Sequence, residues 1–182
     1  MIKPTEKGIN NHENEIGSLS YEEDFESKLG NSDIAEKHLT DWLNDFAEKY
    51  NLDWLNEAEV HNMVLGFREA FINAVVHGNK NDQSKTVTVR LKIKPKQVEI
   101  VIKNEGEWQN WQEAMDRYEK LIEKSEAEPI AIMERGGRGL FMIKKYFNQV
   151  GFNERGNEIT MVRNGSEPSP FTVELEELKK DS

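Results

Sequence analysis

Three polar side chains recur at every fourth position in the segment REAFINAVVHGNK, residues 68–80. They are Glu69, Asn73 and His77, and on a helix they fall within a sector of about 80°. Most of the remaining circumference is apolar. Because an unpaired buried carboxylate costs several kcal/mol, Glu69 must face water, a partner or a ligand. Residues of these types bind metal ions or move protons, so the line could form the floor of a pocket.

Two other interpretations of this polar line stay open. Backbone groups could satisfy the amide and the imidazole, with Glu69 at a solvent-exposed rim. A transition-metal site is disfavoured because the line holds a single histidine. The other histidines are scattered along the chain (His12, His38 and His61).

A second chemical feature is the glycine-rich stretch ERGGRGLFMIKKYF, residues 134–147. Gly136, Gly137 and Gly139 leave room for backbone N–H groups to approach an anion, and the apolar residues that follow predict a helix. A helix N-terminus favours negative charge, so the stretch could cradle a phosphate. It is not a P-loop, because no Gly-Lys-Ser/Thr follows.

The spacing of apolar residues predicts the elements that position these two features. Period-two alternation indicates antiparallel strands, and period-3.6 spacing indicates amphipathic helices. Strands are expected over residues 21–29, 87–93, 98–102 and 157–163, and helices over 34–50, 57–76, 110–128 and directly after the glycine turn. Without a regular βαβ alternation, this order predicts an α/β (α+β) fold: a two-layer sandwich of helices on a mostly antiparallel sheet.

The chain of 182 residues is long enough for one sizeable core. Residues 1–20 have hardly any apolar content, so we expect a disordered tail there, followed by a domain over 21–163. Residues 164–182 form a C-terminal extension in which Phe171 and Val173 begin an alternation, as in a late strand or a docking arm.

Composition narrows the function classes. The chain has 34 acidic and 24 basic residues and a formal charge of −10, which argues against direct nucleic-acid binding. It has no cysteine, so disulfides and thiolate metal sites are excluded. No apolar run could span a membrane, and the N-terminus lacks a secretion signal. We therefore expect a cytoplasmic protein without membrane contact.

Together, the two motifs resemble those of the GHKL ATPases. EAFINAVVHGN looks like their N-box, and RGGRGLFMI looks like the second glycine box of bacterial anti-sigma factor serine kinases. The resemblance covers residues 24–163. It implies the Bergerat ATP-binding fold, with ATP and Mg²⁺ as cofactors, and a two-layer sandwich agrees with the layering expected above.

The resemblance also assigns roles to residues. Asn73 would be the Mg²⁺ ligand, Glu69 would be the base that polarises the attacking hydroxyl, and His77 would have a supporting role. The second glycine box would hold the phosphates (Gly137, Arg138, Gly139 and Leu140).

The resemblance implies a protein-serine/threonine kinase that regulates transcription. Such a kinase binds a sigma factor and phosphorylates an antagonist of the anti-anti-sigma type. The alternative is a catalytically weak or inactive module of the same fold that acts by stoichiometric contact with a partner. A regulatory phosphatase or hydrolase on this fold has no support in the sequence, and homodimerisation stays open.

The sequence departs from the family pattern around KNEGEW. Asn104 stands ahead of Gly106 where the family has an Asp that accepts a hydrogen bond from the adenine amino group. A neutral acceptor makes a weaker hydrogen bond, so ATP affinity is expected to fall about tenfold or more. Trp108 replaces a small residue, and we expect it to anchor, with Trp111, the acidic helical insertion of 110–128. That insertion would be an ordered lid or a surface for another protein.

Overall fold

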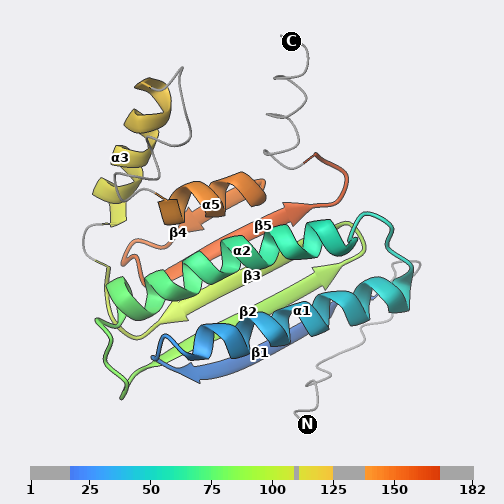
Figure 1. The fold of residues 1–182 in the computed structure, drawn as a ribbon, viewed down its shortest axis with the longest axis horizontal. Helices are drawn as coiled ribbons and strands as arrows, with labels where there is room; N and C mark the ends of the chain where they lie inside the picture. Colours follow the sequence, from blue (N-terminus) through green and yellow to red (C-terminus); the bar gives the residue numbers. More distant parts are fainter. Residues whose placement is uncertain (1–16, 109–110, 125–137, 169–182) are drawn as a thin grey trace.

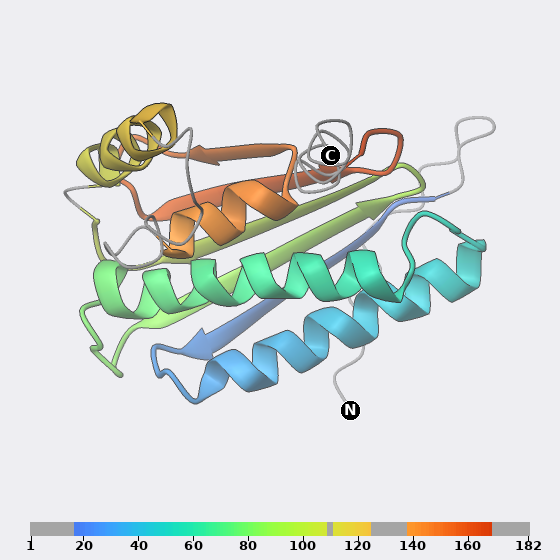
Figure 2. The ribbon, with the colours of Figure 1, turned by 45° about the horizontal axis from the view of Figure 1, so that its top comes forward.

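The computed structural model describes residues 17–108, 111–124 and 138–168. One antiparallel sheet has the strand order β1-β2-β3-β5-β4. Figures 1 and 2 show that helices α1, α2 and α5 all lie on the same face of this sheet. The predicted two-layer α+β sandwich is therefore confirmed.

The strands follow the period-two alternation. They are β1 (Leu19–Glu26), β2 (Thr86–Lys94), β3 (Gln97–Asn104), β4 (Gln149–Phe152) and β5 (Glu158–Asn164). Every second residue of β2 and β3 is buried under the helices: Val87, Val89, Leu91, Ile93, Val98, Ile100 and Ile102. Burial of this apolar face stabilises the packing of the helical layer on the sheet.

The helices are α1 (Asn31–Tyr50), α2 (Glu57–Asn73), α3 (Trp111–Lys124) and α5 (Arg138–Tyr146). The Asn56 side chain caps α2 by accepting the Glu59 N–H at 3.1 Å, and α1 ends at Asn51 in the left-handed conformation (φ 51°). Phe46 of α1 and Phe67 and Phe71 of α2 are fully buried against the sheet. The core thus lies between one helical layer and one sheet face.

A π-helical turn, Ala74–Gly78, continues α2 in place of the regular helix end that the sequence predicted. Its wider turn still ends at the Gly78-Asn79 pair, where the Asn79 N–H donates to the Ala74 carbonyl at 2.8 Å. The last residue of the polar line, His77, therefore lies on a turn whose geometry differs from that of Glu69 and Asn73.

Several element predictions need adjustment. Strand β1 runs from Leu19 to Glu26 instead of over 21–29, and β4 was not predicted. The helical spacing of Ile34, Leu39 and Leu43 predicts that all three lie on the apolar face of the first helix, but Ile34 is 48% exposed. Residues 1–16 and 169–182 lie outside the described residues, so the tail, the domain limits and the late strand stay predictions.

At the N-terminal end of α2, an ion pair between Glu59 and Arg163 connects the helix to β5. Arg163 is only 3% exposed, and its Nε donates to the Glu59 carboxylate at 3.0 Å. Its Nη1 also donates to the Asn148 side chain at 3.0 Å and to the Glu167 carbonyl at 2.8 Å. Within the described part of the chain, none of the helices is long and apolar enough to cross a membrane.

Candidate functional site

Two glycines allow α2 and α5 to cross closely. A Cβ atom on Gly66 of α2 would lie 2.8 Å from the ring of Phe147, just beyond the end of α5. A Cβ atom on Gly139 at the start of α5 would lie 3.1 Å from Glu69 Oε2 and 3.5 Å from Asn73 Nδ2. The helices are thus antiparallel, and the N-terminus of α5 lies over the Glu69 and Asn73 side chains.

At this crossing, the N-terminus of α5 lies beside two polar side chains of α2. The first N–H groups of a helix have no partner within the helix and carry partial positive charge. Glu69 and Asn73 are partly exposed beside them, so they offer oxygen atoms to the same space. The Glu69 carboxylate and the Asn73 amide of the polar line therefore lie beside the backbone N–H groups of the helix that follows the glycine turn.

A slot lies next to this crossing, between α2 and the sheet. Its apolar walls come from Ala70 of α2, from Ala74 of the π-helical turn, and from Ile102 and Ile159 of the sheet. Asn73, Asn104, Trp108, Phe152, Gly156 and Glu158 complete the lining. Asn73 therefore borders both the slot and the start of α5. Apolar walls with a few polar groups are the usual lining of a ligand pocket.

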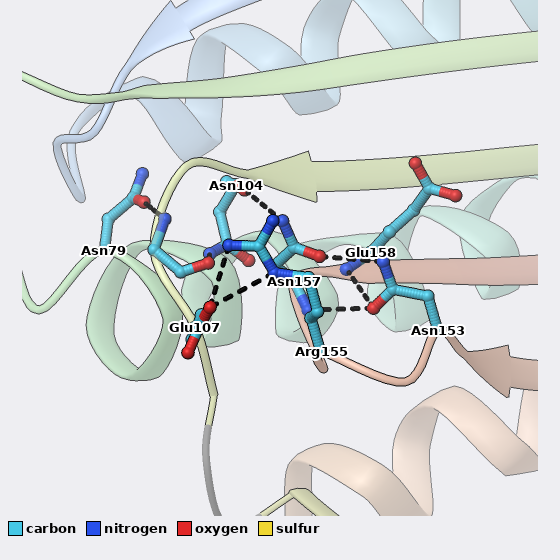
Figure 3. A network of polar contacts seen from close by, with 8 residues as sticks. Asn79, Asn104, Glu107, Asn153, Arg155, Asn157 and Glu158 are labelled. Carbon is cyan, nitrogen blue, oxygen red and sulfur yellow. Dashed lines mark hydrogen bonds and ion pairs between the residues drawn. The ribbon is translucent and has the colours of Figure 1, made fainter.

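Asn104 is a buried polar residue of the slot, 4% exposed at the end of β3. Its Nδ2 donates to the Gly106 carbonyl at 3.0 Å. Its main chain pairs with Asn157, whose carbonyl accepts the Asn104 N–H at 2.9 Å and whose side chain donates to the Asn104 carbonyl at 3.2 Å (Figure 3). The residue is thus held from both its main chain and its side chain.

Asn79 connects the end of the helix to the loop that follows β3. Its side chain is fully buried. Oδ1 accepts the Gly106 N–H at 2.9 Å (Figure 3), and Nδ2 donates to the Thr86 carbonyl at 2.8 Å. A Cβ atom on Gly106 would collide with the Gly78 carbonyl, so this approach requires glycine. The sequence indicated Asn79 only as part of a helix stop, and no local pattern revealed its burial.

Aromatic rings form one side of the slot. His77 stacks on Trp108, with ring centroids 5.2 Å apart and planes at 15°. Trp108 meets the edge of Phe152 at 5.7 Å, and Trp111 stacks on the same Phe152 ring at 5.1 Å. The two tryptophans therefore anchor the start of α3 to β4, as expected.

His77 stands behind Trp108 and does not line the slot. Burial of its ring lowers the pKa of His77, and the positive charge of Lys80 lowers it further. The imidazole is therefore neutral around pH 7. Its supporting role in the site stays a prediction.

The structure brings some of the predicted site residues together and leaves others apart. Glu69, Asn73 and Gly139 meet at the helix crossing, and Asn104 lies in the slot beside it. The Leu140 side chain is 6% exposed in the core, so only its main chain could face a phosphate. Gly106 belongs to the loop held by Asn79. Arg138 is the first residue of α5, and Gly137 lies outside the described residues.

A comparison with protein families agrees with this arrangement. A family model of the histidine kinase-like ATPase domain matches residues 34–163. The chain belongs to this family. No protein of established function matches the sequence significantly. Membership in the ATPase family supports an ATP-binding, kinase-like function and accords with the observed sheet and helices.

The residues of this ATPase domain fit ATP together with Mg²⁺. Across the described ranges, no group of three or more His, Cys, Asp or Glu side chains could hold a metal ion. Mg²⁺ takes oxygen ligands, keeps several waters and commonly shares its shell with substrate phosphates, so a single amide oxygen is a suitable protein contribution. The absent Cβ of Gly139 lets the first turn of α5 lie close to Asn73, where those phosphates would bind.

Proposed function

We propose that this ATPase domain is a bacterial anti-sigma factor of the protein-serine kinase type. It uses Mg-ATP to phosphorylate an anti-anti-sigma antagonist and binds a sigma factor. The observation that carries the proposal is the approach of Gly139 to Glu69 and Asn73. That approach joins a phosphate cradle to a carboxylate base and an amide ligand, which are the parts that phosphoryl transfer needs.

Glu69 is the proposed catalytic base. Its Oε2 atom lies beside Gly139 at the start of α5, where the terminal phosphate would be held. A carboxylate there could accept the proton of an attacking serine hydroxyl while the hydroxyl oxygen bonds to the γ-phosphorus. The bond from that phosphorus to the bridging oxygen would break, and ADP would leave. Because Glu69 is only partly exposed, it can orient that hydroxyl and still be reached from solvent.

Asn73 is the proposed Mg²⁺ ligand, and the first turn of α5 is the proposed phosphate site. When bound, Mg²⁺ would neutralise charge on the phosphate oxygens. The first N–H groups of α5 would hold the same phosphates through charge-assisted hydrogen bonds. Trp108 would cover the base in the slot and exclude water from it.

Phosphoryl transfer tests the kinase proposal directly. Purified protein is incubated with radiolabelled ATP, Mg²⁺ and candidate anti-anti-sigma proteins. Label is expected on the antagonist, and Glu69→Gln should abolish the transfer while ATP still binds. The matched control is Glu48→Gln, which changes an exposed glutamate of α1 and should leave the rate unchanged. Equal transfer by Glu69→Gln and the unmodified protein would refute the role of Glu69.

A second candidate function is a binding module that regulates a partner without catalysis. The neutral Asn104 in the slot favours this candidate, because a neutral acceptor weakens base binding. Calorimetry separates the two functions. ATP affinity weaker than millimolar, together with tight binding to a sigma factor, would leave only the binding module.

A further inference from the structure

Asn104 differs from a carboxylate in one respect that matters for base recognition. The two oxygens of a carboxylate are equivalent, so a rotation of 180° leaves two acceptors in place. The two ends of an amide are an acceptor and a donor, so the same rotation exchanges one for the other. An Asn that selects a base must therefore be fixed in one orientation.

Two contacts in the structure fix the orientation of the Asn104 amide, and we call them the orientation lock. The Gly106 carbonyl accepts a hydrogen bond from Asn104 Nδ2 at 3.0 Å. In the rotated orientation, Oδ1 would face this carbonyl, and two acceptors would repel each other. A Cβ atom on Gly78 would lie almost equally close to Cγ, Nδ2 and Oδ1 of Asn104, so Gly78 packs on the flat face of the amide. Asn104 lines the slot, and these contacts favour the orientation in which Nδ2 is bonded to Gly106 and Oδ1 remains as an acceptor.

The position of the Gly106 carbonyl is set in turn by Asn79. The Asn79 side chain joins the Gly106 N–H at 2.9 Å to the Thr86 carbonyl at 2.8 Å, and it is fully buried. Because strand β2 and the end of α2 fix Asn79 itself, Gly106 has little freedom to move. A chain of hydrogen bonds thus runs from the rigid sheet to the amide in the slot.

We propose that Asn79 is a positioning residue for base selection, acting through Gly106 to hold Asn104 Oδ1 toward the base. This inference rests on the proposed nucleotide binding. A 6-aminopurine donates its amino N–H to the fixed oxygen, whereas a 6-oxopurine presents O6 and is repelled. Asn104 accordingly selects ATP over ITP, although it carries no charge.

The test compares the affinities of Mg-ATP and Mg-ITP by calorimetry. In the unmodified protein, ATP is expected to bind about tenfold more tightly than ITP, or better. Asn79→Ala removes the acceptor of the Gly106 N–H and should bring the ratio close to one. Asn104→Asp in the Asn79→Ala background should restore selectivity, because a carboxylate needs no orientation. A purely structural role of Asn79 would lower both affinities and leave the ratio unchanged.

Asn157→Ala is the matched control. Asn157 is also a buried asparagine, and it bonds to the main chain of Asn104 without touching its amide. This variant should weaken both nucleotides equally. If Asn79→Ala does not fold, Asn79→Asp supplies the test. Burial favours the protonated carboxyl, whose O–H can donate to the Thr86 carbonyl while its other oxygen accepts the Gly106 N–H, so the ratio should be kept.

The outcomes separate this inference from the function on which it rests. Binding of ATP and ITP with equal affinity by the unmodified protein would overturn the orientation lock and leave the ATP site intact. An unchanged ratio in Asn79→Ala would overturn the role of Asn79, as would a lost ratio in Asn79→Asp. If neither nucleotide binds, the proposed nucleotide function fails, and the inference fails with it.

Discussion

Replacing Gly139 by Ala should separate nucleotide binding from folding. The new Cβ atom would lie 3.1 Å from Glu69 Oε2, a contact that the flexible carboxylate can relieve by moving a few tenths of an ångström. Ala is also favoured over Gly by up to about 1 kcal/mol within a helix. These two effects oppose each other, so the free energy of unfolding should change by less than about 1 kcal/mol.

The same methyl group fills the space beside Asn73 where the phosphates would lie. Loss of one hydrogen bond to a charged phosphate costs roughly 1.5–3 kcal/mol, which is about a 10- to 150-fold loss of affinity. Calorimetry with Mg-ATP measures this loss, and thermal unfolding checks the fold. Gly30→Ala is the control, because a Cβ at the start of α1 meets no atom within 4 Å. Unchanged ATP affinity in folded Gly139→Ala would refute the phosphate cradle.

Three further substitutions test separate features of the site. Gly78→Ala drives a Cβ atom into the hydrogen-bonded Asn104 amide, so urea unfolding should show a loss of about 1–3 kcal/mol. Lys80→Gly relieves a left-handed residue (φ 59°) and should raise the free energy of unfolding by up to about 1 kcal/mol. His77→Phe keeps a ring to stack on Trp108 and should flatten the pH dependence of stability below pH 6.5.

The sign of that pH dependence follows from the burial of the imidazole. Partial burial of the His77 ring lowers its pKa in the folded protein below the ordinary value of 6.5, so the unfolded chain binds more protons as the pH falls through 6.5. The unmodified protein should therefore lose stability from pH 6.5 down to the folded-state pKa, relative to His77→Phe. Parallel unfolding curves from pH 5 to 8 would contradict this.

The controls for the other two substitutions lie on the surface. Gly151→Ala on the edge strand β4 meets no atom within 4 Å and should leave stability near that of the unmodified protein. Lys37→Gly in α1 is the control for Lys80→Gly. Lys37 is exposed and has helical backbone angles, so glycine at this position should lower the free energy of unfolding. Destabilisation by Lys80→Gly would show that the backbone there is not strained.

The sequence was most informative where periodicity and chemistry coincide. The alternating residues of β2 and β3 predicted a buried sheet face, and the polar line predicted that Glu69 and Asn73 share one face of α2. The glycine-rich turn predicted the start of α5. Each of these predictions depends only on residues a few positions apart, so the local sequence pattern was sufficient to make it.

The missed features depend on contacts between distant segments. Asn79 is buried because three segments meet around it: the end of α2, the start of β2 and the loop at Gly106. Its sequence neighbours mark only a helix stop. Strand β4 has four residues, too few for a clear alternation, and it forms by pairing with β5. Ile34 matched the helical spacing but is 48% exposed near the start of α1, whereas the adjacent Ala35 is buried.

The central claim is that Asn73, Glu69 and the start of α5 form a Mg-ATP site. Calorimetric titration of the unmodified protein and of Asn73→Ala tests it most directly, with the exposed Asn44→Ala as control. The account predicts one ATP bound per chain in the presence of Mg²⁺, and a loss of that binding in Asn73→Ala alone. Equal ATP affinity in the unmodified protein and Asn73→Ala, or no binding at millimolar ATP, would contradict it.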